Sequence, residues 1–153
     1  MSSLGMISFR FFGGGQMQSS KKLRVIVIED DPTISGLFKK VLQGYGCDVR
    51  TFPDPTAACA VFCSPECDCR MEQPCTDALI TDMVMPNMNG LDLLRLQRKR
   101  GCKALNANKA LMSAITTPQQ QAAVAELGCH FFRKPFNLSE VKQWIKECAE
   151  RIH

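Results

Sequence analysis

Apolar side chains follow two different spacings along the chain, and each spacing predicts one kind of element. Continuous apolar and β-branched runs are typical of strands that are buried on both faces of a parallel sheet. Such runs occupy residues 23–28, 47–52, 77–82, 109–115 and 129–133. Apolar residues three and four apart predict the helices that separate these strands. The first helix follows Pro32 and ends at Gly44 and Gly46, three more cover residues 56–62, 90–100 and 118–127, and Asn137 opens the last.

The alternation of five strands with five helices predicts an α/β fold. Each helix must return the chain to the same end of the sheet before the next strand begins, which gives a parallel sheet with right-handed crossovers. Ligands of such sheets bind beyond the carboxyl ends of the strands. The polar residues at those ends are therefore the candidates for function.

Polar side chains stand at the ends of four of the predicted strands. They are Glu29 and Asp30 on the first strand, Asp82 on the third, Ser113 on the fourth and Lys134 on the fifth. Three carboxylates on one rim repel one another and lose hydration, so the arrangement predicts a bound cation. Mg²⁺ prefers oxygen ligands, and a lysine with a nearby hydroxyl can hold a phosphoryl group. An aspartate can itself be the nucleophile in phosphoryl transfer.

The composition fits one globular domain. The chain has 153 residues, of which 45% are hydrophobic and 22% are charged, which is enough to bury one core. No apolar run is long enough to cross a membrane, so we expect a soluble protein without a membrane partner. The net charge of +4 is too small to predict binding to a polyanion.

Residues 1–22 follow neither spacing, and we expect them to form a flexible N-terminal extension. They also lack the charged and apolar regions of an export signal. With nine cysteines, an odd number, the chain cannot pair all of its thiols internally. We therefore expect a cytoplasmic protein whose thiols are mostly reduced.

Four short motifs, in order and at strand ends, resemble the receiver domain of two-component response regulators. They are VIVIEDDP at residues 25–32, ALITDMVMPNMNG at residues 78–90, SA at residues 113–114 and KPF at residues 134–136. The resemblance covers residues 23–152, the expected receiver domain. It implies a flavodoxin-like, doubly wound sheet of five parallel strands in the order 2-1-3-4-5, with five helices.

The resemblance also implies a role for each residue of the acidic rim. Asp82 would accept the phosphoryl group. Asp30 would bind Mg²⁺ directly, or Mn²⁺ in its place, Glu29 would help to hold the ion through water, and the backbone carbonyl of Val84 would complete the protein ligands. Glu29 stands where the family more often has an aspartate. Asp31, just before Pro32, we interpret as a helix N-terminal acid outside the site.

Three further residues would respond to the phosphoryl group. Ser113 would hydrogen-bond to it, and Lys134 would pair with it. Phe131, three residues before that lysine, falls where the family has its aromatic switch residue. The peptide bond before Pro135 resembles the family's cis peptide.

By this resemblance, the chain would take a phosphoryl group from a sensor histidine kinase or a histidine phosphotransfer protein and then change its binding to an unknown downstream protein. It would be a regulatory protein rather than an enzyme, with only self-phosphorylation and self-dephosphorylation. Because the sequence ends at His153, directly after the last predicted helix, we expect a stand-alone receiver, similar to chemotaxis regulators, that does not bind DNA. We interpret the basic residues between 95 and 103 as a solvated helix face.

A cysteine-rich insertion, residues 63–76, departs from the family, in which this connection is usually much shorter. Its cysteines Cys63, Cys67, Cys69 and Cys75 can be interpreted as a Zn²⁺ site, as a redox-sensing disulfide or as thiols without a function. Their spacing lacks the paired CxxC motifs of common zinc sites. All three interpretations stay open.

Two other classes of function compete with a phosphorylated receiver. One is a phosphorylation-independent docking module, or a redox or metal sensor, that uses the segment from Cys63 to Cys75. The presence of Asp30, Asp82 and Lys134 argues against a mere docking scaffold. The other is a phosphatase of the haloacid dehalogenase type, which also uses an aspartyl nucleophile. That class needs a second aspartate two residues later, where this chain has Val84.

Overall fold

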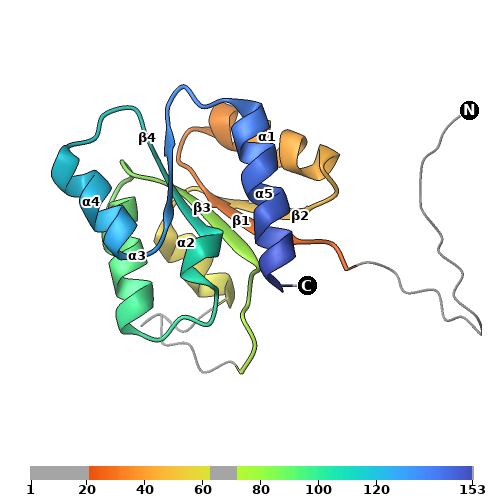
Figure 1. The fold of residues 1–153 in the computed structure, drawn as a ribbon, viewed down its shortest axis with the longest axis horizontal. Helices are drawn as coiled ribbons and strands as arrows, with labels where there is room; N and C mark the ends of the chain where they lie inside the picture. The colour runs from red at the N-terminus through yellow and green to blue at the C-terminus, as the bar shows by residue number, and fades with distance from the viewer. Residues whose placement is uncertain (1–20, 63–71, 153) are drawn as a thin grey trace, which may run out of the picture.

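The computed structural model describes residues 21–62 and 72–152, and this part of the chain forms a five-stranded sheet between two layers of helices (Figure 1). In chain order the elements are β1 Arg24–Ile28, α1 Pro32–Gly44, β2 Asp48–Phe52, α2 Pro55–Phe62, β3 Ala78–Asp82, α3 Gly90–Lys99, the 3₁₀ turn η2 Asn106–Asn108, β4 Lys109–Ser113, α4 Pro118–Glu126, β5 His130–Arg133 and α5 Leu138–Ile152. All strand pairs are parallel, in the order β2-β1-β3-β4-β5. The predicted fold class and strand order are confirmed.

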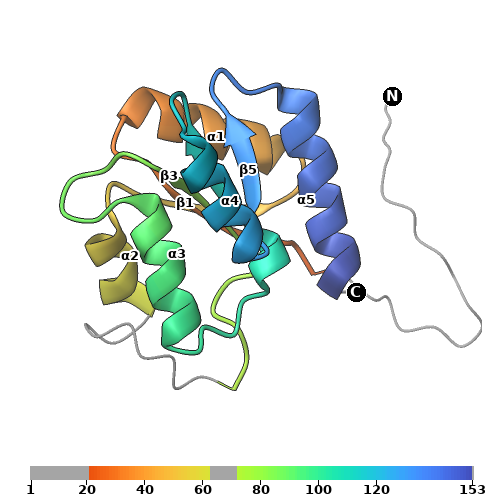
Figure 2. The same cartoon turned by 60° about the vertical axis from the view of Figure 1, so that its left-hand side comes forward.

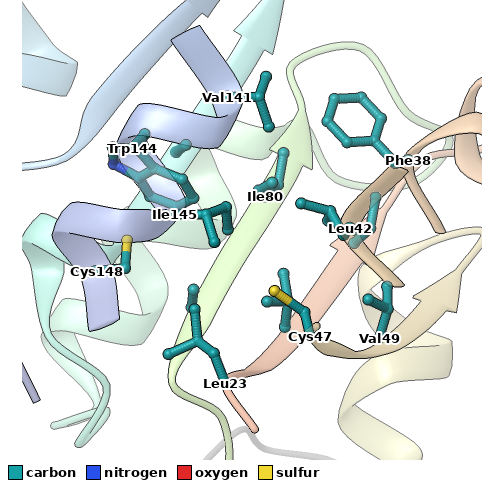
Figure 3. Packing of buried hydrophobic residues seen from close by; sticks show 14 of the residues in the cluster. Leu23, Phe38, Leu42, Cys47, Val49, Ile80, Val141, Trp144, Ile145 and Cys148 are labelled. Atoms are coloured by element: carbon teal, nitrogen blue, oxygen red, sulfur yellow. The ribbon is translucent and has the colours of Figure 1, made fainter. Parts of the chain in front are cut away.

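One face of the sheet is covered by α1 and α5 (Figures 1 and 2). Phe38 and Leu42 of α1 meet Trp144, Ile145 and Cys148 of α5 over the inward side chains of the strands (Figure 3). All five side chains are buried. This layer contains the chain's one tryptophan, which is therefore a fluorescent reporter of the core.

The other face is covered by α2, α3 and α4 (Figure 2). Leu91 and Leu94 of α3, Val124 of α4 and Ala58 of α2 pack against the second set of strand side chains. Because both faces are covered, every residue of β3 and β4 is buried. This double burial explains why the strands are continuous apolar runs rather than alternating ones.

Side-chain caps define where several of the helices begin, among them α1 and α4. Asp31 caps α1, and its Oδ1 accepts a hydrogen bond from the Thr33 amide at 2.8 Å. This agrees with its interpretation as a helix N-terminal acid. Thr117 and Gln120 form a reciprocal capping box at the start of α4. Both caps satisfy amide groups that a helix start otherwise leaves without partners.

The structure corrects the predicted end of the fourth strand. The fourth strand was predicted to reach residue 115, but β4 ends at Ser113 and the side chain of Ile115 is 84% exposed. The chain has passed the edge of the sheet there, so this apolar side chain finds no layer to pack against.

Most of the predicted N-terminal extension, residues 1–22, and most of the cysteine-rich insertion lie outside the described residues. Within the part that the structure describes, none of the helices combines the length and the hydropathy that a membrane span requires.

Candidate functional site

Three carboxylates gather at the carboxyl edge of the sheet. Glu29 and Asp30 directly follow β1, and Asp82 is the last residue of β3, the strand that pairs with β1. One oxygen of each carboxylate lies within 4.8 Å of the other two. Glu29 and Asp82 are buried, whereas Asp30 is exposed. The structure thus brings together the acidic residues that the sequence singled out.

Lys134, directly after β5, reaches into this acidic cluster. Its Nζ lies 3.1 Å from Oδ1 of Asp82 and donates to Oε2 of Glu29 at 3.3 Å. The backbone amide of Lys134 donates to the carbonyl of Ser113 at 2.9 Å, which holds the lysine beside the end of β4. The peptide bond between Lys134 and Pro135 is cis. One cation therefore faces two of the three carboxylates.

The cluster changes the proton affinity of its own members. Burial raises the pKa of Glu29, and the charge of Asp82 raises it further, against the hydrogen bond from the Asp31 amide and the charge of Lys134. Burial acts to lower the pKa of Lys134, but the hydrogen bond and charge of Asp82, together with Glu29, outweigh it and raise that pKa. The carboxylates favour a positive neighbour, and Lys134 is held in its charged form.

The two oxygens of Glu29 already have partners. Oε1 accepts from the Asp31 amide at 3.1 Å, and Oε2 accepts from Lys134. The exposed Asp30 is the more open of the two adjacent acids. This difference supports direct binding of a cation by Asp30 and an indirect, water-mediated contribution from Glu29.

Oxygen donors of this kind fit Mg²⁺, which favours a few carboxylates together with water and phosphate oxygens. Asp30 and Asp82 would hold it directly, with Glu29 behind them. Val84, whose carbonyl would be a further ligand, lies two residues after Asp82 and is 73% exposed. The roles of these four residues stay predictions. Among the described residues, this cluster is the one group of three or more candidate metal ligands.

Gly90, the first residue of α3, is part of the site's construction, and sequence reasoning missed it. A Cβ at this position would lie 2.2 Å from the backbone oxygen of Asp82. The Gly90 amide donates to the carbonyl of Met83 at 2.9 Å, and the Met83 amide donates to Met112 at 2.8 Å. The loop after Asp82 is therefore clamped between α3 and β4. A glycine that follows Asn89 at the predicted helix start was the signal that could have revealed it.

Ser113 and Phe131, the predicted switch residues, lie at the end of β4 and within β5. The buried Ser113 hydroxyl donates to the carbonyl of Ile115 at 2.7 Å and accepts from the Ile115 amide at 3.3 Å. Phe131 is half-buried and packs against the core layer that contains α3 and α4. In this structure Ser113 is thus bonded to its own loop, and the switch roles stay predictions.

The predicted cysteine site is only partly described. Cys63, Cys67 and Cys69 lie outside the described residues. Cys75 is half-buried, and its carbonyl accepts from Nη1 of Arg24 at 3.2 Å. Arg24 opens β1, so Cys75 lies at the opposite end of the sheet from the acidic cluster. Nothing in the described part of the insertion brings a thiol to the carboxylates.

Comparison with known proteins identifies the family. The model of the response regulator receiver domain matches residues 25–146, and the chain therefore belongs to that family. Members of this family are regulatory phosphoacceptors of two-component signalling rather than classical enzymes. They bind Mg²⁺ at an acidic pocket and interact with histidine kinases or phosphotransfer proteins.

Two curated relatives show how much of a longer protein this sequence matches. It is 31% identical over 126 residues to the alkaline phosphatase synthesis transcriptional regulatory protein SphR of Synechococcus elongatus, covering 80% of this chain and 47% of that protein. It is 25% identical over 133 residues to the DNA-binding response regulator MtrA of Mycolicibacterium smegmatis, covering 84% of this chain and 51% of that protein. The chain spans about half the length of these relatives. The expectations of a stand-alone receiver, of no DNA binding and of a cytoplasmic location stay predictions.

Solved structures show the same fold. The receiver domain of the Francisella response regulator 1452 matches with a TM-score of 0.70 at 21% identity, covering 86% of this chain and 100% of that one. The chemotaxis protein CheY4 of Vibrio cholerae matches with a TM-score of 0.65 at 21% identity, covering 84% of this chain and 99% of that one.

Proposed function

We propose that this chain is a phosphorylation-controlled switch in which Asp82 accepts a phosphoryl group from the phosphohistidine of a sensor histidine kinase or a histidine phosphotransfer protein. The observation that supports this most directly is the contact of Lys134 with Asp82 and Glu29 inside a cluster of three carboxylates. That arrangement provides a nucleophile, a fixed positive charge and ligands for a divalent cation at one point. We further propose that the reaction depends on Mg²⁺, with Mn²⁺ as a substitute.

In the proposed reaction, a carboxylate oxygen of Asp82 attacks phosphorus while the bond between phosphorus and the donor imidazole breaks. Lys134 lies beside Oδ1 of Asp82, so we expect the other oxygen, Oδ2, to receive the phosphoryl group. Bound Mg²⁺ supplies positive charge against the phosphoryl oxygens. Positioning and charge neutralisation of this kind are the main protein contributions to phosphoryl transfer.

Switching follows from the new charge at the end of β3. The Ser113 hydroxyl, now bonded to Ile115, would turn to the phosphoryl oxygens and release the loop that begins there. We propose that Phe131 then changes its packing on the layer formed by α3 and α4, which alters the surface presented to a downstream protein. The phosphoryl group shifts the equilibrium because it interacts better with one of the two loop conformations.

We propose that the phosphorylated chain acts on a protein target rather than on DNA. The basic end of α3 is partly committed to local contacts, which supports its interpretation as a solvated helix face. Nη1 of Arg95 lies 3.7 Å from Asp92, and Nη1 of Arg98 donates to the carbonyl of Glu126 at 3.2 Å. The second contact joins α3 to the end of α4.

The direct test is intact mass after incubation with acetyl phosphate, with and without Mg²⁺. We expect one phosphoryl adduct that requires Mg²⁺ and that Asp82→Asn abolishes. Asp48→Asn is the matched control, because it removes an exposed carboxylate at the start of β2, away from the acidic cluster, and should leave the adduct unchanged.

Two outcomes would contradict the proposal. An adduct that persists in Asp82→Asn would place the acceptor elsewhere. No adduct in the unchanged chain, with zinc or a disulfide detected in the segment from Cys63 to Cys75, would favour the sensor alternative.

A further inference from the structure

Lys109 is a buried amine that the proposed phosphoryl transfer does not use. It opens β4, four residues before Ser113, and only 1% of its surface is exposed. Lysine side chains almost always keep their charged end in water. Among the described residues, its Nζ has no hydrogen-bond partner. A buried polar group in this condition costs free energy and calls for a physical explanation.

The strand register places Lys109 beside Cys129. In the parallel pair of β4 and β5, Ala110 is opposite His130 and Leu111 is opposite Phe131. Lys109 and Cys129 each come one residue earlier in the same register, Lys109 as the first residue of β4 and Cys129 directly before β5. Because side chains alternate along a strand, Lys109 points to the same face as Leu111. Cys129 packs on that same face, against the core layer that includes Leu111.

The charges around the thiol agree with this placement. Burial raises the pKa of Cys129, whereas the charges of Lys109 and Arg98 lower it. The thiol makes one long contact, from Sγ to the carbonyl of Leu127 at 3.9 Å. Cys129 is half-buried, so a small solute reaches it more easily than it reaches a fully buried thiol.

We propose that Lys109 and Cys129 form a covalent redox link, a sulfenamide bond between Nζ and Sγ, in the presence of a peroxide. The peroxide first oxidises the thiol to a sulfenic acid and releases one water. Nζ, once it has released the extra proton of its ammonium form to solvent, attacks the sulfenic sulfur, and the hydroxyl group leaves with a further proton from nitrogen as a second water. One thiol, one amine and one hydrogen peroxide give one sulfenamide and two waters. Sulfur loses the two electrons that the peroxide gains.

Cys148 shows why the pairing with a lysine matters. This thiol is fully buried, and burial raises its pKa to about 12. Its neighbour is Arg151, whose Nη1 lies 3.7 Å from Sγ. A guanidinium keeps its proton in proteins and is a poor nucleophile, so the same reaction is closed to this pair. The pair of Lys109 and Cys129 therefore differs from the pair of Arg151 and Cys148 in having an amine that can act as a nucleophile.

The link would restrain the strand that carries the proposed switch residue. Phe131 follows Cys129 by two residues on the same face of β5. Tying Cys129 to β4 therefore limits how far this strand can shift. Peroxide would in this way act on the same core layer as phosphorylation at Asp82, but from the opposite end of the sheet.

The test is peptide mapping of the full chain after treatment with hydrogen peroxide and alkylation of the remaining thiols. We expect a cross-linked peptide pair that joins Lys109 to Cys129, has lost two hydrogens, and separates on reduction with dithiothreitol. Lys109→Met keeps much of the side-chain volume but removes the amine, and Cys129→Ser removes the thiol, so each variant should lose the pair. Lys99→Met, on α3, is the control and should retain it.

Two results would overturn the proposal. One is oxidation of Cys129 only to a disulfide or to sulfinic and sulfonic acids, with Lys109 unmodified. The other is a cross-link to Cys129 that persists in Lys109→Met, since another amine would then be the partner. If Lys109→Met does not fold, the mapping of the unchanged chain and of Cys129→Ser decides the question.

Discussion

Replacing Gly90 with alanine tests how closely α3 packs against the strand that carries Asp82. The new Cβ would lie 2.2 Å from the backbone oxygen of Asp82 and 2.5 Å from Cδ1 of Leu111. Ordinary contacts begin near 3.4 Å, so one of the two backbones must move by more than 1 Å. The Leu111 methyl group can turn away. The Asp82 oxygen cannot, because it belongs to the backbone at the end of a central strand.

The expected magnitude follows from this overlap. Overpacking of a close contact costs about 1–3 kcal/mol, and we expect Gly90→Ala to lower the free energy of unfolding by that amount. A displacement of about 1 Å at a reacting group can cost on the order of 100-fold in rate. We therefore expect phosphorylation of Asp82 by acetyl phosphate to slow by at least about 10-fold.

Gly36 provides the matched control, because it lies in the exposed part of α1 and an added Cβ would meet nothing within 4 Å. Gly36→Ala should raise the free energy of unfolding by about 0.5–1 kcal/mol, since alanine loses less backbone entropy than glycine in a helix. Urea unfolding followed by Trp144 emission measures stability, and intact mass measures phosphorylation. If Gly90→Ala matches Gly36→Ala in both assays, the close packing of α3 on β3 is not what shapes the site.

Two further predictions concern ion pairs and pH. Burial acts to raise the pKa of Asp77, but hydrogen bonds from Arg24, with Nη2 to Oδ1 at 2.8 Å, outweigh it and lower the pKa. This pair therefore stabilises the fold at neutral pH and loses its effect as pH falls below about 4. Asp77→Asn should cost about 1–3 kcal/mol in urea unfolding at pH 7 and less in acid, and equal losses at both pH values would contradict this. Burial lowers the pKa of His130 against the opposing charge of Glu140, so its protonation destabilises the fold below about pH 6.5. The centre of its ring lies 5.9 Å from that of the Trp144 ring, so Trp144 emission should change with pH, with a midpoint below about pH 6.5. His130→Gln should remove this transition. A midpoint above about pH 6.5 would refute the assignment.

Much of the fold could be predicted from the sequence, because burial on both faces of a sheet leaves continuous apolar runs. The run over residues 77–82 became β3, Ala78–Asp82, and its final aspartate was placed correctly at the strand end. The end of β4 could not be found in this way. Ile115 is apolar, but the Ser113 hydroxyl bonds to the Ile115 backbone where the chain turns, and the Lys134 amide donates to the Ser113 carbonyl. This last bond depends on Lys134, which directly follows a strand much further along the chain.

The candidate site, too, could be predicted from the sequence only in part. The sequence alone indicated which carboxylates, hydroxyl and lysine stand at strand ends, because the spacing of apolar residues predicts the order of strands and helices. It did not show that Lys134 contacts both Glu29 and Asp82, since those distances depend on how the four strands β1, β3, β4 and β5 pair. It also did not distinguish Gly90 from any other helix-opening glycine.

The local pattern of apolar and polar residues thus determined the fold class, the strand ends and the identity of the candidate groups. Tertiary packing decided which of these groups meet and how closely. It also decided that Lys109, a residue whose sequence context predicts only the start of a strand, is buried beside the β5 strand. The physical reason is that the spacing of apolar residues depends on a single strand or helix, whereas the contacts and burial of a side chain depend on the other elements that pack against it.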